Sequence, residues 1–198
     1  IDRSPLFTTT EHTMKKIINQ LLRMGLITVT GILGSITSGL MIHGSDVFDY
    51  RGIYFAFVAF GLSGAFIFSF YHVFGLSNAI TVAVSVSAFQ FIAAATTMPL
   101  LNAAFWSFGV NIPVVGLAFL FERKLSVLHE WKFVVVGAVY GSVFVLLTLI
   151  IGIFREISPI PPSVFQDNFI DGLLIGIGMG LGVQAGEAFV HSLFPDKK

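Results

Sequence analysis

The sequence of 198 residues contains no cysteine, and only 11% of its residues are charged. The lack of cysteine excludes disulfide bonds, thiolate metal sites and thiol catalysis. Charge is scarcer than in soluble domains, where about a quarter of the residues carry one. The formal net charge is +0, so the chain lacks the basic excess that collects nucleic-acid phosphates. These absences argue against a nucleic-acid partner and against a soluble domain.

Hydrophobic residues are abundant instead. They make up 55% of the chain, and the mean hydropathy is +0.88. No Asp, Glu, Lys or Arg lies between Gly52 and Phe121. One bilayer crossing needs about 20 apolar residues, so this interval alone has room for about three crossings. The sequence therefore predicts an all-α, polytopic integral membrane protein.

Breaks at glycine, proline and polar residues divide the apolar sequence into predicted transmembrane helices. The six predicted spans are residues 17–42, 52–74, 78–98, 101–121, 133–154 and 169–194. An N-terminal interfacial tail of residues 1–16 precedes the six-helix domain of residues 17–194, and a tail of residues 195–198 follows it. The loops are short, so no separate soluble domain fits between the spans.

Basic residues are divided unevenly between the two predicted membrane faces. Six spans put both termini on one face, and that face with its helix ends holds nine Lys and Arg residues, whereas the opposite face holds only Arg51 and Arg155. Basic residues are enriched on the cytoplasmic side of membrane proteins. We therefore expect both termini on the cytoplasmic or matrix side of a bacterial or organellar inner membrane.

The last predicted span has a glycine at almost every second position of "IGIGMGLGVQAGE", residues 175–187. On an α-helix its glycines form two adjacent ladders, because residues four apart share a face. One ladder is Gly172, Gly176 and Gly180, and the other is Gly178, Gly182 and Gly186.

Small residues let helices approach closely in lipid, where the hydrophobic effect does not drive them together. The first span repeats the spacing at Gly31, Ser35 and Gly39, so we expect the first and last helices to touch. The alternative is that the glycine surface lines a solute path or holds a flat cofactor.

A carboxylate, Glu187, lies at the end of the glycine surface, with Gln184 and His191 one turn before and after it. An ionisable group inside a span is costly unless it is paired or hydrated, so it is a candidate functional site. Glu187 lies close enough to the inner end of its span to reach interfacial water, which favours a structural or interfacial carboxylate, and a proton- or cation-binding residue is the alternative.

His72, near the end of the second span, falls at the same predicted depth as His191. Two histidines near an interface usually face lipid headgroups. The alternative is a shared haem or metal, which would need two ligands at matched depth. The sequence does not identify a cofactor.

Polar residues of the third and fourth spans extend the set of transport or binding candidates to Gln90, Asn102 and Asn111. Such groups must find hydrogen-bond partners in lipid. Ser63 and His191 could not act together as a catalytic nucleophile and base. Ser63 lies roughly 17 Å into its helix and His191 about 33 Å into its own, so the two side chains would be too far apart in depth for a hydrogen bond.

These features favour a small-solute or ion transporter or channel component without enzyme activity. The alternative is a non-catalytic, membrane-embedded subunit of a larger respiratory, photosynthetic or similar complex. A haem-binding protein or another membrane enzyme is a minor alternative. The expected partners are the lipid bilayer and either other membrane subunits or further copies of the chain.

Overall fold

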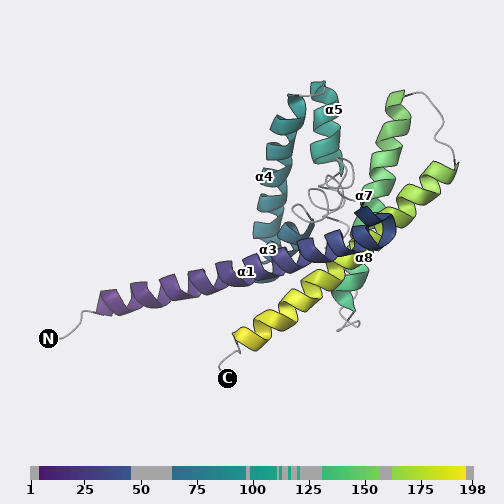
Figure 1. Cartoon of the computed structure of the whole chain (residues 1–198). Coiled ribbons are helices and arrows are strands. Elements are labelled where there is room, and N and C mark those ends of the chain that lie inside the picture. Colours follow the sequence, from purple (N-terminus) through teal and green to yellow (C-terminus); the bar gives the residue numbers. More distant parts are fainter. Residues whose placement is uncertain are drawn as a thin grey trace.

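The computed structural model describes residues 5–45, 64–96, 99–110, 112, 116, 120, 131–156 and 162–194. All regular structure in these residues is helical and none of it is a strand, as the sequence predicts. The helices are α1 (Pro5–His43), α3 (Phe66–Phe74), α4 (Leu76–Ala95), α5 (Leu100–Ala104), the π-helical η3 (Phe105–Val110), α7 (Lys132–Glu156) and α8 (Pro162–Leu193) (Figure 1).

Proline and glycine set several of the helix boundaries. α1 and α8 each begin with a proline, at Pro5 and Pro162, which fits the first turn because its backbone needs no amide donor there. Gly44 follows the end of α1 with a φ of 58°, and Gly75 separates α3 from α4 with a φ of 85°. Glycine adopts this left-handed conformation without the clash of a Cβ, so the chain can leave the helix at both places.

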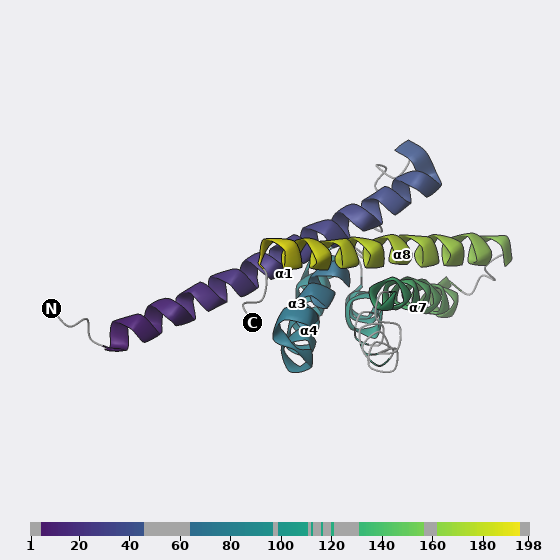
Figure 2. The same ribbon diagram turned by 90° about the horizontal axis from the view of Figure 1, so that it is seen from below.

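Two long helices, α1 and α8, cross near the middle of the molecule (Figure 1). α8 lies between α1 and α7, and α3, α4 and α7 all stand on the same side of α1 (Figure 2). α4 and α7 are seen nearly end-on in the view in which α1 and α8 lie lengthwise (Figure 2). The molecule is therefore a crossed pair of long helices, with the shorter helices gathered on one side of α1.

The described helices follow the order of the predicted spans. Two segments, Thr13–His43 and Gln166–Leu193, are long and apolar enough to cross a membrane by length and composition. Ile80–Ile92 and Lys132–Leu147 are shorter apolar helical segments. Core helices of soluble proteins can meet the same criterion, so the count of six spans stays a prediction.

Glycine residues bring the backbone of α8 into direct contact with the backbones of α7 and α1. A Cβ added at Gly176 would collide with the carbonyl oxygen of Gly137 in α7. On the other side, a Cβ added at Gly182 would collide with the carbonyl oxygen of Thr30 in α1. Any side chain at these positions would push the helices apart, so glycine is required by the distance between the backbones.

The two glycine ladders of α8 face two different helices. Gly172, Gly176 and Gly180 lie against α7, whereas Gly178, Gly182 and Gly186 lie against α1. The expected contact between the first and last predicted spans is thus present. α7, which presents Gly137 and Gly141 to Gly176, is a second partner that the sequence analysis did not propose.

The small residues proposed for the first span, Gly31, Ser35 and Gly39, are all buried. Gly31 lies where α1 meets α8 and Ala65, the residue before α3. A neighbouring residue of α1, Gly34, is in backbone contact with α8, because a Cβ added there would collide with the carbonyl oxygen of Gly178.

Hydroxyl groups join α1 to two other helices. Ser38 Oγ donates a hydrogen bond of 2.7 Å to the carbonyl oxygen of Leu174 in α8. Thr28 Oγ1 and Ser69 Oγ of α3 form a buried hydrogen bond of 2.6 Å. Such bonds add attraction between helices, and the second of them fixes α3 beside the middle of α1.

The most buried side chains gather where α1, α3, α7 and α8 meet. Tyr140 of α7 is fully buried, and its ring packs edge-on against Phe68 of α3, with 5.8 Å between the ring centroids. Ile27 of α1 and Met179 of α8 complete this core. The shorter helix α3 is thereby held at a defined position against the long pair.

Replacement of Gly176 by alanine tests the backbone contact between α8 and α7. We expect Gly176→Ala to reduce the free energy of unfolding by about 1–3 kcal/mol, the usual cost of overpacking. Gly25→Ala in α1 is the matched control, because a Cβ there meets nothing within 4 Å and alanine favours the helix. Thermal unfolding of the full chain in detergent measures both. Equal midpoints would show that α7 and α8 are not in backbone contact.

Candidate functional site

The candidate site lies at the end of α8 that carries Glu187. This residue follows Gly180 by two turns, so it projects on the side where α8 meets the start of α7. His72, in the last turn of α3, comes to the same place. Its ring packs edge-on against Phe133 of α7, with 5.6 Å between the ring centroids. The glycine contact and the short helix α3 together bring a carboxylate and an imidazole into reach.

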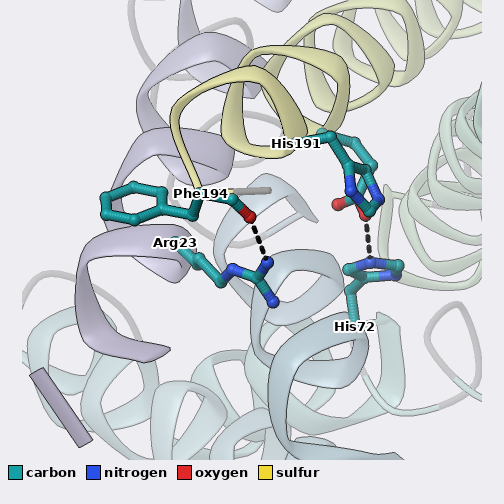
Figure 3. Close-up of polar contacts among 5 residues, drawn as sticks. Arg23, His72, His191 and Phe194 are labelled. Atoms are coloured by element: carbon teal, nitrogen blue, oxygen red, sulfur yellow. Dashed lines mark hydrogen bonds and ion pairs between the residues drawn. The ribbon is translucent and has the colours of Figure 1, made fainter. Parts of the chain in front are cut away.

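Two imidazoles approach one oxygen of the carboxylate. Nε2 of His72 lies 2.7 Å from Oε1 of Glu187, and Nε2 of His191 lies 3.4 Å from the same oxygen. The side chains of Glu187, His72 and His191 are 20%, 31% and 57% exposed, respectively. The carboxylate is thus the most buried member, and His72 is less exposed than His191. The shorter contact, to His72, is the dashed line that ends at this residue in Figure 3. We call these three residues the His–Glu–His cluster.

α1 contributes an arginine beside the cluster. Arg23 Nη2 donates a hydrogen bond of 3.2 Å to the carbonyl oxygen of Phe194, just beyond the end of α8 (Figure 3). A guanidinium near a C-terminal helix end interacts favourably with the exposed carbonyls there. Arg23 therefore ties α1 to the end of α8 and adds positive charge next to Glu187.

A cavity of about 110 Å³ connects the arginine with the cluster. Its lining combines polar and apolar side chains from α1, α3 and α8, namely Gln20, Arg23, Ile27, His72, Val73, Glu187 and Val190. A polar cavity of this size can hold a few water molecules, since each occupies about 30 Å³ in the liquid. Water can therefore reach the carboxylate from inside the site.

The cluster is chemically suited to holding and passing a proton. Carboxylates and imidazoles are the usual acid–base groups of proteins, and imidazole changes its charge near neutral pH. An imidazole donates to the carboxylate only through a protonated Nε2, so the proton on His72 and the charge on Glu187 depend on each other.

Metal or haem ligation by His72 and His191 is not what this geometry favours. Both Nε2 atoms face one carboxylate oxygen, whereas a bis-histidine haem requires an iron between the two ring nitrogens. In the described ranges, no group of three or more His, Cys, Asp or Glu side chains is arranged to hold a metal ion.

The other predicted site residues do not join the cluster. Gln184 is partly buried, its Oε1 lacks a hydrogen-bond partner within the described part of the chain, and it is not among the lining residues of the cavity. Gln90 belongs to α4 and likewise does not line this cavity. Asn102 is a helical position of α5, and Asn111 lies outside the described residues.

Sequence reasoning missed Arg23 and Gln20 as neighbours of Glu187, and it missed the direct contact of Glu187 with His72. The predicted depth in the membrane could have indicated these neighbours. All four residues fall near the ends of their predicted spans that lie on the side of the termini. Depth follows from counting residues along each helix, whereas contact also requires the rotation of each helix and the choice of neighbours.

The chain matches no protein-family model, no curated protein and no solved structure. A shared fold would in any case not fix the function, which depends on the chemistry of the site. The His–Glu–His cluster and its cavity therefore carry the functional inference.

Loss of the two histidines should have unequal effects. His72→Ala should lower the free energy of unfolding by about 1 kcal/mol or more, because it removes the closer hydrogen bond to a half-buried carboxylate. His191→Ala should cost only a few tenths of a kcal/mol, as do other exposed pairs of residues four apart on a helix. Unfolding midpoints in detergent measure both, and a larger effect of His191→Ala would contradict the arrangement.

Proposed function

We propose that this protein is a membrane protein that spans the bilayer six times and moves a proton, or another small ion or solute, with Glu187 as the binding group. Both termini lie on the cytoplasmic or matrix side in this proposal. The observation that carries it is the His–Glu–His cluster on a water-sized polar cavity, at one end of two long apolar helices.

Ionisable contacts at both ends of the α1–α8 pair support the membrane location. Arg23 and the cluster lie at one end, and His43 Nε2 lies 3.2 Å from Asp171 Oδ2 at the other. Arg23 and His43 are 20 residues apart in α1, or about 30 Å at about 1.5 Å per residue. This length equals the hydrocarbon thickness of a bilayer, about 30 Å. No Asp, Glu, Lys or Arg lies between these positions in α1.

Partial burial of Glu187 supports the role of the carboxylate. A charged group at the edge of the hydrocarbon is costly unless it is paired, and such residues commonly mark ion and proton pathways. Here the two imidazoles can take up or supply the proton that neutralises the carboxylate. A change of proton occupancy at Glu187 would also change the contacts that connect α3, α8 and α1.

A second candidate function is that of a membrane-embedded subunit of a larger complex. It is favoured by the exposed apolar side chains of α4 and α5, among them Phe89, 74% exposed, and Leu101, 68% exposed. Apolar surface of this kind is covered either by lipid or by neighbouring subunits. In a subunit of this kind, the His–Glu–His cluster would hold the end of α3 against the end of α8, and the protonation of the three side chains would not change.

The topology can be tested because the chain has no natural cysteine. In sealed cells, the single variants Ser45→Cys and Ser163→Cys should react with a membrane-impermeant thiol reagent added outside. Ser126→Cys should react only after the membrane is opened, because its loop lies on the same side as the basic termini. Labelling of Ser126→Cys from outside would overturn the orientation.

Flux through the reconstituted protein tests the role of Glu187. Glu187→Gln keeps the shape and a hydrogen-bond acceptor for His72 but cannot become charged, so proton or ion flux in proteoliposomes should fall at least tenfold at equal incorporated protein. Asp171→Asn is the matched control, since it alters another carboxylate paired with a histidine, at the other end of α8, and it should retain most of the flux. Unchanged flux in Glu187→Gln, or equal loss in both variants, would contradict the proposal.

A further inference from the structure

Few side-chain oxygens line the cavity beside the His–Glu–His cluster. Of the described residues that line it, only Gln20 and Glu187 carry side-chain oxygens, whereas Arg23 and His72 present nitrogens. Hard metal cations are held by a shell of about six or more oxygen ligands, some of which are water. The side chains here offer a metal cation only a small part of such a shell.

One oxygen of the Glu187 carboxylate is already approached by two ring nitrogens. His72 Nε2 lies 2.7 Å and His191 Nε2 lies 3.4 Å from Oε1. A metal cation at this oxygen would have to displace an imidazole or share the oxygen with it. A proton binds covalently to a single oxygen or nitrogen and needs no shell of ligands, so it can pass along the existing contacts.

The chain supplies its own cation at this end of the helices. His72 lies in the last turn of α3 and Val190 lies in the last turn of α8. The C-terminal ends of helices carry a partial negative charge that attracts cations. Arg23 Nη2 donates its hydrogen bond to the carbonyl oxygen of Phe194 at the end of α8, and Arg23 lines the same cavity as Glu187 (Figure 3). The guanidinium therefore occupies the place where a metal cation would be most favoured.

Fixed positive charge stands on two sides of the cluster. Arg23 of α1 keeps its charge at any pH that a folded protein tolerates. Lys132 of α7 lies over the ring of Phe133, with 4.8 Å from Nζ to the ring centroid, and that ring packs against His72. The imidazoles of α3 and α8 become positive as well when they are protonated. An added metal cation is therefore opposed from α1, α3, α7 and α8.

We propose that the His–Glu–His cluster takes up a proton and not a metal cation, and that Arg23 is the residue that excludes metal cations from the cavity. The inference rests on the proposed function, in which Glu187 is the binding group, and it names the proton as the ion that Glu187 binds. Protons reach the carboxylate through water in the cavity and through His72. Arg23 thereby ties α1 to α8 and also determines which ion enters.

Infrared difference spectroscopy of the full chain in phosphatidylcholine vesicles tests the proposal. The carbonyl band of protonated Glu187 is identified as the band that Glu187→Gln removes. Its intensity is followed against pH in choline chloride and in sodium chloride of equal concentration. Sodium that competes with the proton would lower the midpoint pH, because metal binding displaces protons from its ligands. In the wild-type chain the two midpoints should coincide.

Substitution of Arg23 tests its part in the exclusion. Arg23→Gln removes the charge and keeps a donor for the Phe194 carbonyl, so sodium should then lower the midpoint by about one pH unit or more, a tenfold competition. Arg23→Lys is the matched control, because it keeps the charge, and its midpoint should be as insensitive to sodium as that of the wild-type chain. If Arg23→Gln fails to assemble, the wild-type chain in sodium and in choline still decides whether a metal cation competes for Glu187.

A wild-type midpoint that falls in sodium would overturn the proposal, and so would the absence of a Glu187 band at every pH. An equal response of Arg23→Gln and the wild-type chain would overturn the role of Arg23. Proton and sodium flux into proteoliposomes separates these failures from that of the proposed function. Flux of sodium through the wild-type chain would retain transport and contradict the inference. A sodium-insensitive titration without any flux would support the inference and contradict transport.

Discussion

Backbone contact along α8 is the constraint on which the rest of the molecule depends. One row of its glycines meets the carbonyl oxygens of α7 and the other row meets those of α1. Van der Waals contact and interhelical hydrogen bonds both grow as helix backbones come closer. The bond from Ser38 Oγ to the Leu174 carbonyl exists only because no side chain separates the two helices there.

The same contact positions the chemistry. Gly180 admits the Phe133 carbonyl of α7, and Glu187 follows two turns later on the same side of α8. α3 reaches this point because Ser69 is bonded to Thr28 and because Phe68 packs on Tyr140. A carboxylate that is only 20% exposed is stabilised by charged or hydrogen-bonding partners, and α3, α8 and α1 place His72, His191 and Arg23 around it.

Much of the helix order and the glycine surface of α8 was predictable from the sequence, because apolar length and small-residue spacing are local patterns. The choice of α7 as the second partner was missed, although Gly137 and Gly141 have the same spacing of four residues. Small residues can pack against lipid or against any neighbour, so spacing alone does not select a partner. The sequence predicts that His72 and Glu187 lie at similar depths, but not that they are in contact. The two residues are 115 positions apart in the chain, and residue counting does not give the rotation of each helix about its axis. Gln184 lies on the same predicted polar stripe, but within the described residues its Oε1 has no hydrogen-bond partner and it does not line the cavity.

The fold brings Glu187 of α8 and His72 of α3 together as one contacting pair. A double-mutant cycle with His72→Ala, Glu187→Ala and the double variant measures their coupling most directly, through unfolding free energies at neutral pH in detergent. A coupled pair should give an interaction energy of about 1 kcal/mol or more. A control cycle with His191→Ala in place of His72→Ala should give a much smaller interaction energy. Additive effects of His72→Ala and Glu187→Ala would contradict the account, because the two side chains would then act independently.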